Sequence, residues 1–308
     1  MKSLTLRQLQ YFDAIARHGH FGRAAEACAV TQPALSMQLK ELEATLGTPL
    51  LERSGRHVRL SAFGEAALAR ARDALQAIDD IGDLARTARG ELSGRLRIGV
   101  IPTIAPYLLP KILATLGQTF PTADPHVRET VTPVLLSEIA DGGLDLAILA
   151  LPTSEAALEE FALFEEPFLL VRPLAEAAAP PPDVEALRQM RLLLLEEGHC
   201  FRDQALAVCG IGASAPREVL DASSLSTLVQ MVSAGIGVTL IPAMARDVET
   251  RSAQVAISHF GTPEPTRTIG VVWRAASPLA AQFRKLGGAL AGSLRPVRAD
   301  CDTTNESG

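Results

Sequence analysis

Residues 6–46 read LRQLQYFDAIARHGHFGRAAEACAVTQPALSMQLKELEATL, and this stretch decides the fold of the N-terminal part of the chain. Leu9, Phe12 and Ile15 lie at helical spacing, so a first helix is expected with these side chains on its packed face. Gly19 follows the periodic stretch and predicts the end of that helix, because glycine is the usual residue just past a helix C-terminus.

Two further helices are expected after this one. Residues 21–28 are rich in alanine, as close helix packing requires, and Thr31 precedes a proline and a run of leucines at helical spacing. A tight turn at residues 29–30 joins the two. This order predicts a helix-turn-helix motif that presents its last helix to the DNA major groove. The residues expected to face DNA are Thr31, Gln32, Pro33, Ser36, Gln38 and Lys40.

A basic hairpin is expected next. Two short apolar stretches, residues 50–51 and residues 58–60, flank a polar turn, and the hairpin carries Arg53, Arg56 and Arg59. Such a β-wing reaches DNA phosphates and supplies affinity without reading bases. The alternative is a three-helix bundle with a solvated basic hairpin.

Charge and composition limit the class of protein to which the chain can belong. Residues 1–62, here called the head, hold eight Lys and Arg against five Asp and Glu, which gives a net charge of +3. The whole chain has a net charge of −6, so the remainder, here called the body, carries −9. No stretch is apolar enough to span a membrane, and the N-terminus lacks a secretory signal. We therefore expect a cytoplasmic protein that does not contact a membrane. With four cysteines in 308 residues, any disulfide is expected to be conditional.

A long helix is expected between head and body, capped by Ser61 and ending near Arg89. Its apolar residues alternate at spacings of three and four, as in a coiled-coil seam. They are Leu68, Ala71, Leu75, Ile78, Gly82 and Ala85. Two chains paired along this seam would place two heads on an inverted-repeat DNA site. The alternative is a helix packed on its own effector domain.

From Arg95 onward strands and helices alternate. Strands are expected at residues 96–101, 126–131, 144–151, 168–171, 192–195, 218–221, 238–241 and 269–273, and helices at residues 104–119, 134–141 and 225–234, near Met244, and from Ser277. Apolar strands between helices indicate an α/β body with parallel sheets covered on both faces.

Cys200 and Cys209 lie in one expected helix. Nine residues at about 1.5 Å rise would hold them about 13 Å apart and on opposite faces, whereas a disulfide needs Cα atoms within about 7 Å. Bonding them would require the segment to refold, which is the behaviour of a redox sensor. Cys200 begins the helix, beside His199 and near Arg202, so its thiol is expected to be acidic and reactive.

The chain resembles the LysR-type transcriptional regulators. The head resembles their winged helix over residues 6–68. In the body, GHCFRDQALAVC (198–209), IPTIAPYLLPKI (101–112), TRTIG (266–270) and LVQMVSAGIGVTLIPA (228–243) resemble the peroxide-sensing members of that family.

The resemblance implies a winged helix-turn-helix, a linker helix, and a two-subdomain effector domain similar to periplasmic binding proteins. The expected domain bounds are residues 1–62, 63–91 and 92–302, with subdomain I at 92–165 and 267–302, subdomain II at 166–266, and a disordered tail at 303–308. It also implies dimers that pair into tetramers, double-stranded DNA and RNA polymerase as partners, hydrogen peroxide as signal, and no metal or cofactor.

The site residues come from the same resemblance. It implies that Cys200 is the peroxidatic residue and Cys209 the resolving one, and that the peroxide pocket is lined by Thr103, Thr132, His199, Asp203 and Arg267. Around Thr132 the chain departs from the family, because Val131 and Pro133 stand where polar residues are expected. This departure affects the expected peroxide rate more than the chemistry.

Two other functions are compatible with the sequence. One keeps the DNA-binding head but places a small metabolite in the cleft between subdomains. The other makes the body a thiol peroxidase, an enzyme, which the absence of a Cys-x-x-Cys motif or recycling cysteine disfavours. Cys28 is expected to fill the core of the head, and Cys301 lies in the polar tail.

Overall fold

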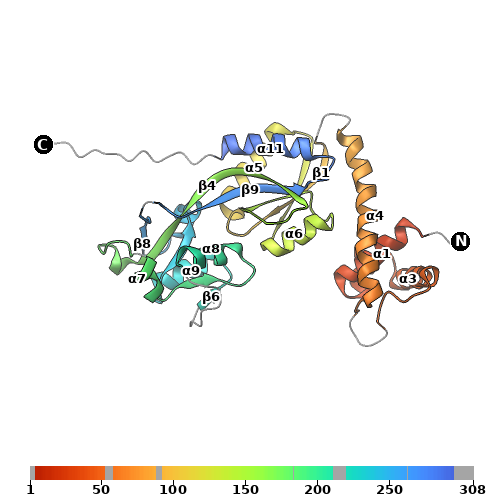
Figure 1. Cartoon of the computed structure of the whole chain (residues 1–308), viewed down its shortest axis with the longest axis horizontal. Helices are drawn as coiled ribbons and strands as arrows, with labels where there is room; N and C mark the ends of the chain where they lie inside the picture. Colours follow the sequence, from red (N-terminus) through yellow and green to blue (C-terminus); the bar gives the residue numbers. More distant parts are fainter. Residues whose placement is uncertain are drawn as a thin grey trace. The chain divides into compact units, whose positions relative to one another are not determined.

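A computed structural model describes residues 4–52, 58–87, 92–182, 184–210, 220–261 and 263–294. The chain divides into two compact units, Met1–Arg89 and Gly90–Gly308 (Figure 1). Within the described residues, no helix is long and apolar enough to cross a lipid bilayer.

The first unit is helical. Its helices are α1 (Leu6–His18), α2 (Phe21–Ala27), α3 (Gln32–Leu46) and α4 (Ala62–Thr87). The predicted helix ends are found where expected: Gly19 ends α1 in the left-handed conformation (φ 61°), and the Thr31 side chain accepts a hydrogen bond from the Ala34 amide in the first turn of α3. Ala29 also has a positive φ, 53°, and makes the tight turn between α2 and α3.

The predicted wing is described only at its base. Leu51 and Leu60 form a single antiparallel bridge rather than two strands, and the Glu43 carboxylate accepts the amides of Leu50 and Leu51. Arg53 and Arg56 lie outside the described residues.

The seam predicted along α4 divides into two parts. Ser61 caps the helix as expected, because its hydroxyl accepts the amide of Gly64. Leu68 and Ala71, however, are buried in the core of their own unit, so the first half of the seam packs on the head. The apolar residues left exposed on the second half are Ile78, Ile81 and Leu84.

The second unit is an α/β body. Its elements are β1 (Gly94–Val100), α5 (Ala105–Thr119), β2 (Ala123–Glu129), α6 (Thr132–Ala140), β3 (Leu146–Leu151), β4 (Leu158–Pro173), the 3₁₀ helix η1 (Leu174–Glu176), α7 (Val184–Gln189), β5 (Leu193–Leu195), α8 (Cys200–Val208), β6 (Leu220–Ala222), α9 (Leu225–Ser233), β7 (Thr239–Pro242), the 3₁₀ helix η2 (Ala243–Ala245), α10 (Arg246–Glu249), β8 (Val255–Ser258), β9 (Thr266–Arg274) and α11 (Ala280–Ser293).

The sheets are mixed, so the prediction of parallel sheets is wrong for the middle of the body. Among the described residues the large sheet has the order β2-β1-β3-β9-β4-β7, with β8 also on β4. β1 is parallel to β2 and β3, but β9 is antiparallel to β3 and β4, and β4 is antiparallel to β7 and β8. The reason is connectivity: β4 carries the chain out of one subdomain and β9 brings it back in the opposite direction.

Each subdomain has its own hydrophobic core, and β4 contributes residues to both of them. The core of subdomain I runs from Leu92 to Leu163 and from Ile269 to Leu294, and the core of subdomain II from Phe168 to Ala256. In Figure 1 the long ribbons β4 and β9 join the two groups of elements. The finer domain bounds drawn from the sequence stay a prediction.

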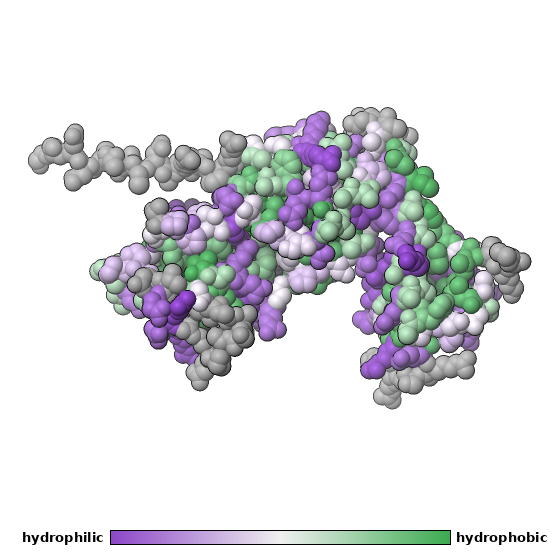
Figure 2. Space-filling view, in the orientation of Figure 1, coloured by the Kyte–Doolittle hydropathy of each residue, from purple (hydrophilic) through white to green (hydrophobic). Residues whose placement is uncertain are grey.

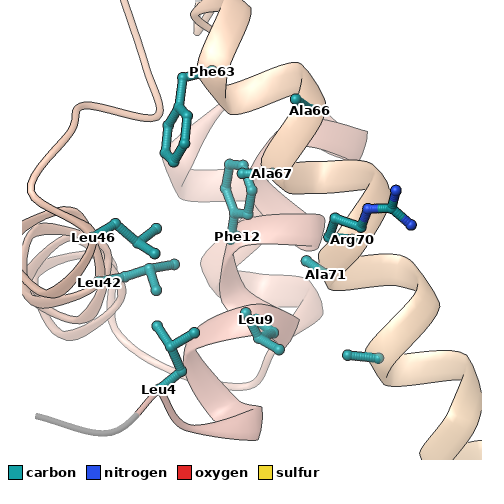
Figure 3. A pocket seen from close by; sticks show the side chains of 11 residues that line it. Leu4, Leu9, Phe12, Leu42, Leu46, Phe63, Ala66, Ala67, Arg70 and Ala71 are labelled. Carbon is teal, nitrogen blue, oxygen red and sulfur yellow. The ribbon is translucent and has the colours of Figure 1, made fainter. Parts of the chain in front are cut away.

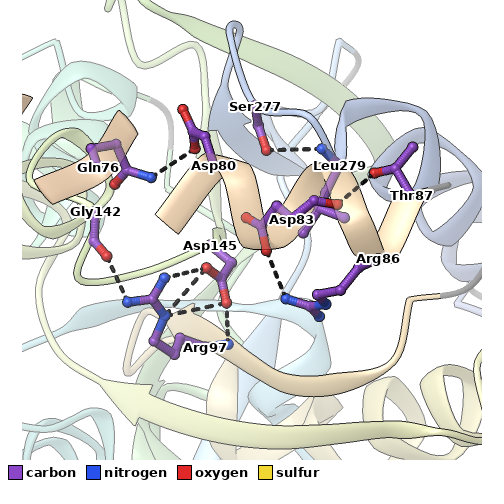
Figure 4. Close-up of polar contacts among 10 residues, drawn as sticks. All are labelled: Gln76, Asp80, Asp83, Arg86, Thr87, Arg97, Gly142, Asp145, Ser277 and Leu279. Carbon is purple, nitrogen blue, oxygen red and sulfur yellow. Dashed lines mark hydrogen bonds and ion pairs between the residues drawn. The ribbon is translucent and has the colours of Figure 1, made fainter. Parts of the chain in front are cut away.

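A partly buried ion pair fixes the loop that leads into β3. The Arg97 guanidinium bonds both carboxylate oxygens of Asp145 and donates to the carbonyl of Gly142, at 2.7 Å (Figure 4). A two-pronged arginine contact of this kind has a defined geometry. It therefore ties the loop before β3 to strand β1.

Candidate functional site

The helix α8 holds the two cysteines apart. It begins at Cys200, with His199 as its N-cap, and Cys209 is its C-cap. Nine residues of helix separate them by about 13 Å along the axis and by half a turn around it. Both are thiols in this structure. The helix expected from the sequence is thus present, and no disulfide can form without unwinding it.

The two cysteines also belong to different surroundings. Cys200 is half-buried and packs against the core of subdomain I. Cys209 is fully buried within the core of subdomain II. The first thiol therefore sits where the two subdomains meet, and the second is enclosed by one of them.

Arg267 and Thr103 form a buried polar contact between β9 and the start of α5. Nη1 of Arg267 donates to the Thr103 hydroxyl at 3.0 Å, and Nη2 donates to its carbonyl at 3.1 Å. The same guanidinium pairs with Glu166, with Nη2 to Oε2 at 2.7 Å. Burial raises the pKa of the Glu166 carboxyl, although the charge of Arg267 and a hydrogen bond from the Met244 amide act in the opposite sense.

Phe201 connects this contact to α8. Its ring lies 5.1 Å below the carbon of the Arg267 guanidinium and 5.2 Å from the ring of Phe168. Phe201 follows Cys200 directly, so the residue after the thiol is held against the Arg267 and Thr103 contact by a cation–π interaction.

Of the other predicted residues, His199 lines a pocket with Thr103, and Thr132 directly follows a residue of that lining. His199 and Thr103 line one pocket together with Val131, which caps α6 immediately before Thr132. Burial is the main reason that the pKa of His199 is lowered, and the charge of Glu196 opposes that shift. The Thr132 hydroxyl is buried and makes no hydrogen bond with any described residue.

Two residues near Cys200 are not part of this group. Asp203 is exposed on α8 and makes no hydrogen bond or ion pair within the described part of the chain. Arg202, which was expected to acidify the thiol, donates instead to the carbonyl of Leu195 and to the carboxylate of Asp221.

The pocket shared by Thr103 and His199 has a volume of about 370 Å³. It lies between α5 of subdomain I and α9 and α10 of subdomain II. Tyr107 donates to Glu249 at 2.7 Å and Ser226 donates to the same carboxylate at 2.5 Å. Both hydrogen bonds lie in one wall of the pocket, and the one from Tyr107 joins the two subdomains.

Sequence reasoning missed four partners of the site, Glu166, Phe201, Tyr107 and Glu249. Glu166 is paired with Arg267 in the register of β4 and β9, and the two lie 101 residues apart in the chain. The one local signal was the pair of adjacent glutamates before Pro167, since alternate residues of a strand point to opposite faces.

The residues expected from the sequence to bind DNA lie on one helix and its flank. Thr31, Gln32, Pro33 and Lys40 are exposed at α3, Ser36 and Gln38 are half-buried, and Arg59 is exposed at the base of the wing. Gln38 is bonded to Glu41 at 3.0 Å, so it would have to exchange that partner to read a base. The described residues contain no cluster of three or more His, Cys, Asp or Glu side chains that could hold a metal ion.

Two family models match the chain. The model for bacterial regulatory helix-turn-helix proteins of the lysR family covers residues 6–65, and the LysR substrate binding domain model covers residues 89–295. The chain is 42% identical over 300 residues to a probable hydrogen peroxide-inducible genes activator of Streptomyces viridosporus, covering 96% of each chain. It is 40% identical over 291 residues to the DNA-binding transcriptional dual regulator OxyR of Escherichia coli, covering 93% of this chain and 95% of that one.

Solved structures show the same likeness. A full-length cysteine-to-aspartate variant of OxyR from Pseudomonas aeruginosa matches with a TM-score of 0.75 and 36% identity, over 94% of this chain and 95% of that one. A cysteine-to-serine variant of OxyR from Corynebacterium glutamicum, bound to hydrogen peroxide, matches with a TM-score of 0.63 and 36% identity, over 94% and 92%.

Proposed function

Because the chain belongs to the LysR family of bacterial helix-turn-helix regulators, we propose that it is a transcription regulator in which peroxide oxidation of Cys200, followed by bonding to Cys209, is the signal. The observation that carries this proposal is the position of Cys200. On one side His199 lines the same pocket as Thr103. On the other, Phe201 lies beneath Arg267, which binds Thr103.

The first step joins the Cys200 sulfur to one oxygen of hydrogen peroxide. The thiolate supplies an electron pair, the S–O bond forms and the O–O bond breaks. The second oxygen leaves as hydroxide, which takes up a proton to become water, and Cys200 becomes a sulfenic acid. Negative charge grows on the departing oxygen, so hydrogen-bond donors placed near it lower the barrier.

Thr103, Thr132 and Arg267 suit that donor role. The Thr103 hydroxyl oxygen accepts a hydrogen bond from Arg267, so its own proton is available to a bound peroxide. The buried Thr132 hydroxyl makes no hydrogen bond with the described residues, and a ligand oxygen would supply one. His199 would orient the site as a neutral imidazole, while Asp203 is assigned to it on the family resemblance alone.

The second step forms the disulfide. The Cys209 thiol attacks the sulfenic sulfur of Cys200, the S–S bond forms, and the sulfenic oxygen leaves as water. Because α8 holds the two residues about 13 Å apart along its axis, the helix has to unwind for the sulfurs to meet. Cys200 then leaves its contact with the core of subdomain I, which is how a covalent change alters the shape of the body.

The DNA-binding output requires two heads. In the first unit an apolar groove of about 450 Å³ lies between α1, α3 and α4, with Phe63, Phe12 and Leu42 directed into it (Figure 3). Figure 2 shows further apolar residues on the face of this unit that carries α4 and α1. A second copy of α4 would cover this surface and form the dimer. Two α3 helices would then bind an inverted repeat.

From the family resemblance we further expect these dimers to pair into tetramers. Oxidation of Cys200 would then change the spacing of the heads on DNA. A changed spacing would alter the contact with RNA polymerase, which links the redox state of the body to transcription.

Mass spectrometry of the full-length protein before and after micromolar peroxide tests the chemistry. We expect a Cys200–Cys209 disulfide in the wild type, a trapped sulfenic acid in Cys209→Ser, and neither in Cys200→Ser. Cys28→Ser is the control and keeps the disulfide. An unchanged oxidation product in Cys209→Ser would exclude that residue as the resolving one, and identical operator footprints of reduced and oxidised protein would remove the link to DNA.

The pocket between the subdomains favours a second function, in which a small metabolite bound there is the signal. It is of ligand size, and its walls come from both subdomains. Calorimetry with candidate metabolites tests this function. Binding that shifts operator affinity, together with a full response in Cys200→Ser, would favour it over peroxide sensing.

A further inference from the structure

The Glu166 carboxylate is fixed on both of its oxygens. Oε2 accepts Nε of Arg267 at 2.8 Å and pairs with Nη2 at 2.7 Å. Oε1 accepts the backbone amide of Met244 at 2.9 Å. Glu166 and Arg267 are each only 3% exposed and are register partners on β4 and β9. A carboxylate held at both ends cannot rotate without breaking a buried hydrogen bond.

These contacts decide where the Arg267 guanidinium points. An arginine side chain has five N–H donors in one plane. Nε and one N–H of Nη2 are directed at Glu166, the other N–H of Nη2 at the Thr103 carbonyl, and one N–H of Nη1 at the Thr103 hydroxyl. Within the described residues the second N–H of Nη1 has no acceptor. The Phe201 ring covers one face of the same group.

We propose that Glu166 is a positioning residue for the reaction of Cys200 with peroxide, because it turns the Nη1 edge of Arg267 toward Thr103 and the thiol site. This inference rests on the proposed function of that site. With Glu166 in place, the Thr103 hydroxyl has to accept from Arg267, so its proton is directed to the peroxide. Without Glu166, the Arg267 guanidinium is free to turn, and neither it nor the Thr103 hydroxyl stays aligned as a donor to the peroxide.

The test compares two reagents for the same thiol in full-length protein carrying Cys209→Ser, so that oxidation stops at the sulfenic acid. Hydrogen peroxide needs donors to its departing oxygen, whereas iodoacetamide alkylation reports only the accessibility and ionisation of Cys200. We expect Glu166→Gln to slow the peroxide reaction on the order of ten- to hundredfold and to change alkylation less than about twofold.

Glu165→Gln is the matched control. Glu165 is the preceding residue of β4, is exposed, and accepts hydrogen bonds from the hydroxyls of Thr266 and Thr268. It has the same chemistry on the opposite face of the strand. We expect both rates in this variant to equal those of the Cys209→Ser parent.

A double-variant cycle tests whether Glu166 acts through Arg267. In an Arg267→Ala background, Glu166→Gln is expected to change the peroxide rate less than about twofold, because the group it positions is gone. Glu166→Asp keeps the charge and secures the test if Glu166→Gln does not fold. Its shorter side chain cannot hold Arg267 and Met244 together, so an intermediate peroxide rate is expected.

Three outcomes contradict the inference. They are an unchanged peroxide rate in the folded Glu166 variants, equal losses with both reagents, and an undiminished effect in the Arg267→Ala background. Failure of the proposed function looks different. In that case Cys200 of the parent protein reacts with peroxide no faster than cysteine in solution.

Discussion

Tyr107 on α5 donates a 2.7 Å hydrogen bond to Glu249 on α10, and this bond joins the two subdomains at the wall of the pocket between them. Glu249 accepts a second hydrogen bond from Ser226 and is 9% exposed. Burial, and then the hydrogen bond to Glu249, raise the pKa of the Tyr107 phenol. The phenol therefore stays protonated, and a hydrogen-bond donor, above the pH at which an ordinary tyrosine ionises.

Tyr107→Phe is expected to destabilise the body by about 1–3 kcal/mol, because a buried carboxylate loses one of its two hydroxyl donors. Urea unfolding followed by circular dichroism measures the change. The chain has one other tyrosine, Tyr11, whose hydroxyl makes no hydrogen bond within the described residues. Tyr11→Phe is thus the control and is expected to stay within about 0.5 kcal/mol of the wild type. Equal losses in the two variants would show that the Glu249 contact contributes nothing.

The parts of the fold that local chemistry determines could be read from the sequence. Thr31 and Ser61 cap helices, and Gly19 ends one, because each acts on amides or angles within four residues of itself. The helix from Cys200 has no side-chain cap, and it was predictable from the helical spacing of its apolar residues. The first half of β4, Leu158–Glu165, was not predicted, because its strand conformation depends on pairing with β9 more than a hundred residues later.

The residues of the site also divide into those that the sequence indicated and those that only the fold brings together. The resemblance supplied Thr103 and Arg267, and the structure brings them together, but their shared partner Glu166 could be found only from the register of two distant strands. Arg202 has a partner that the sequence did not indicate. Its closeness to Cys200 in sequence suggested a role at the thiol, whereas the helix turns its guanidinium toward Asp221.

Thr132→Val is expected to separate stability from reactivity. The hydroxyl of Thr132 is buried without a hydrogen bond among the described residues, so replacing it with a methyl group of similar size should leave the free energy of unfolding unchanged or raise it by up to about 1 kcal/mol. If the hydroxyl serves the peroxide, the oxidation rate of Cys200 falls at the same time. Thr132→Ser keeps the hydroxyl and is expected to retain the rate, and a loss of stability in Thr132→Val would show that the hydroxyl has a structural partner.

His199 is expected to make the body less stable in mild acid. Burial lowers its pKa from the usual 6.5, so the folded protein binds the proton more weakly than the unfolded chain does. The stability contributed by the neutral ring is complete above the unfolded pKa and is lost as the pH falls through the lower, folded value. Urea unfolding between about pH 7.5 and pH 5 should therefore show a smaller decrease for His199→Gln than for the wild type.

If His199→Gln shows the same pH dependence as the wild type, the half-buried ring of His199 is not the group that titrates.

Ile81→Glu tests the proposed dimer through α4. Ile81 is 66% exposed and is absent from the core of its own unit, so a glutamate there should leave the head folded. In a dimer the same carboxylate would be buried in an apolar seam, which is unfavourable without a partner charge. Sedimentation should then show dissociation, and affinity for an inverted repeat should fall on the order of a hundredfold because the two heads no longer bind together.

Asp79→Lys, on the opposite face of α4, is the control and should leave both the sedimentation and the DNA affinity unchanged. If the Ile81→Glu protein is still a dimer, the subunit contact lies elsewhere than on this face of α4.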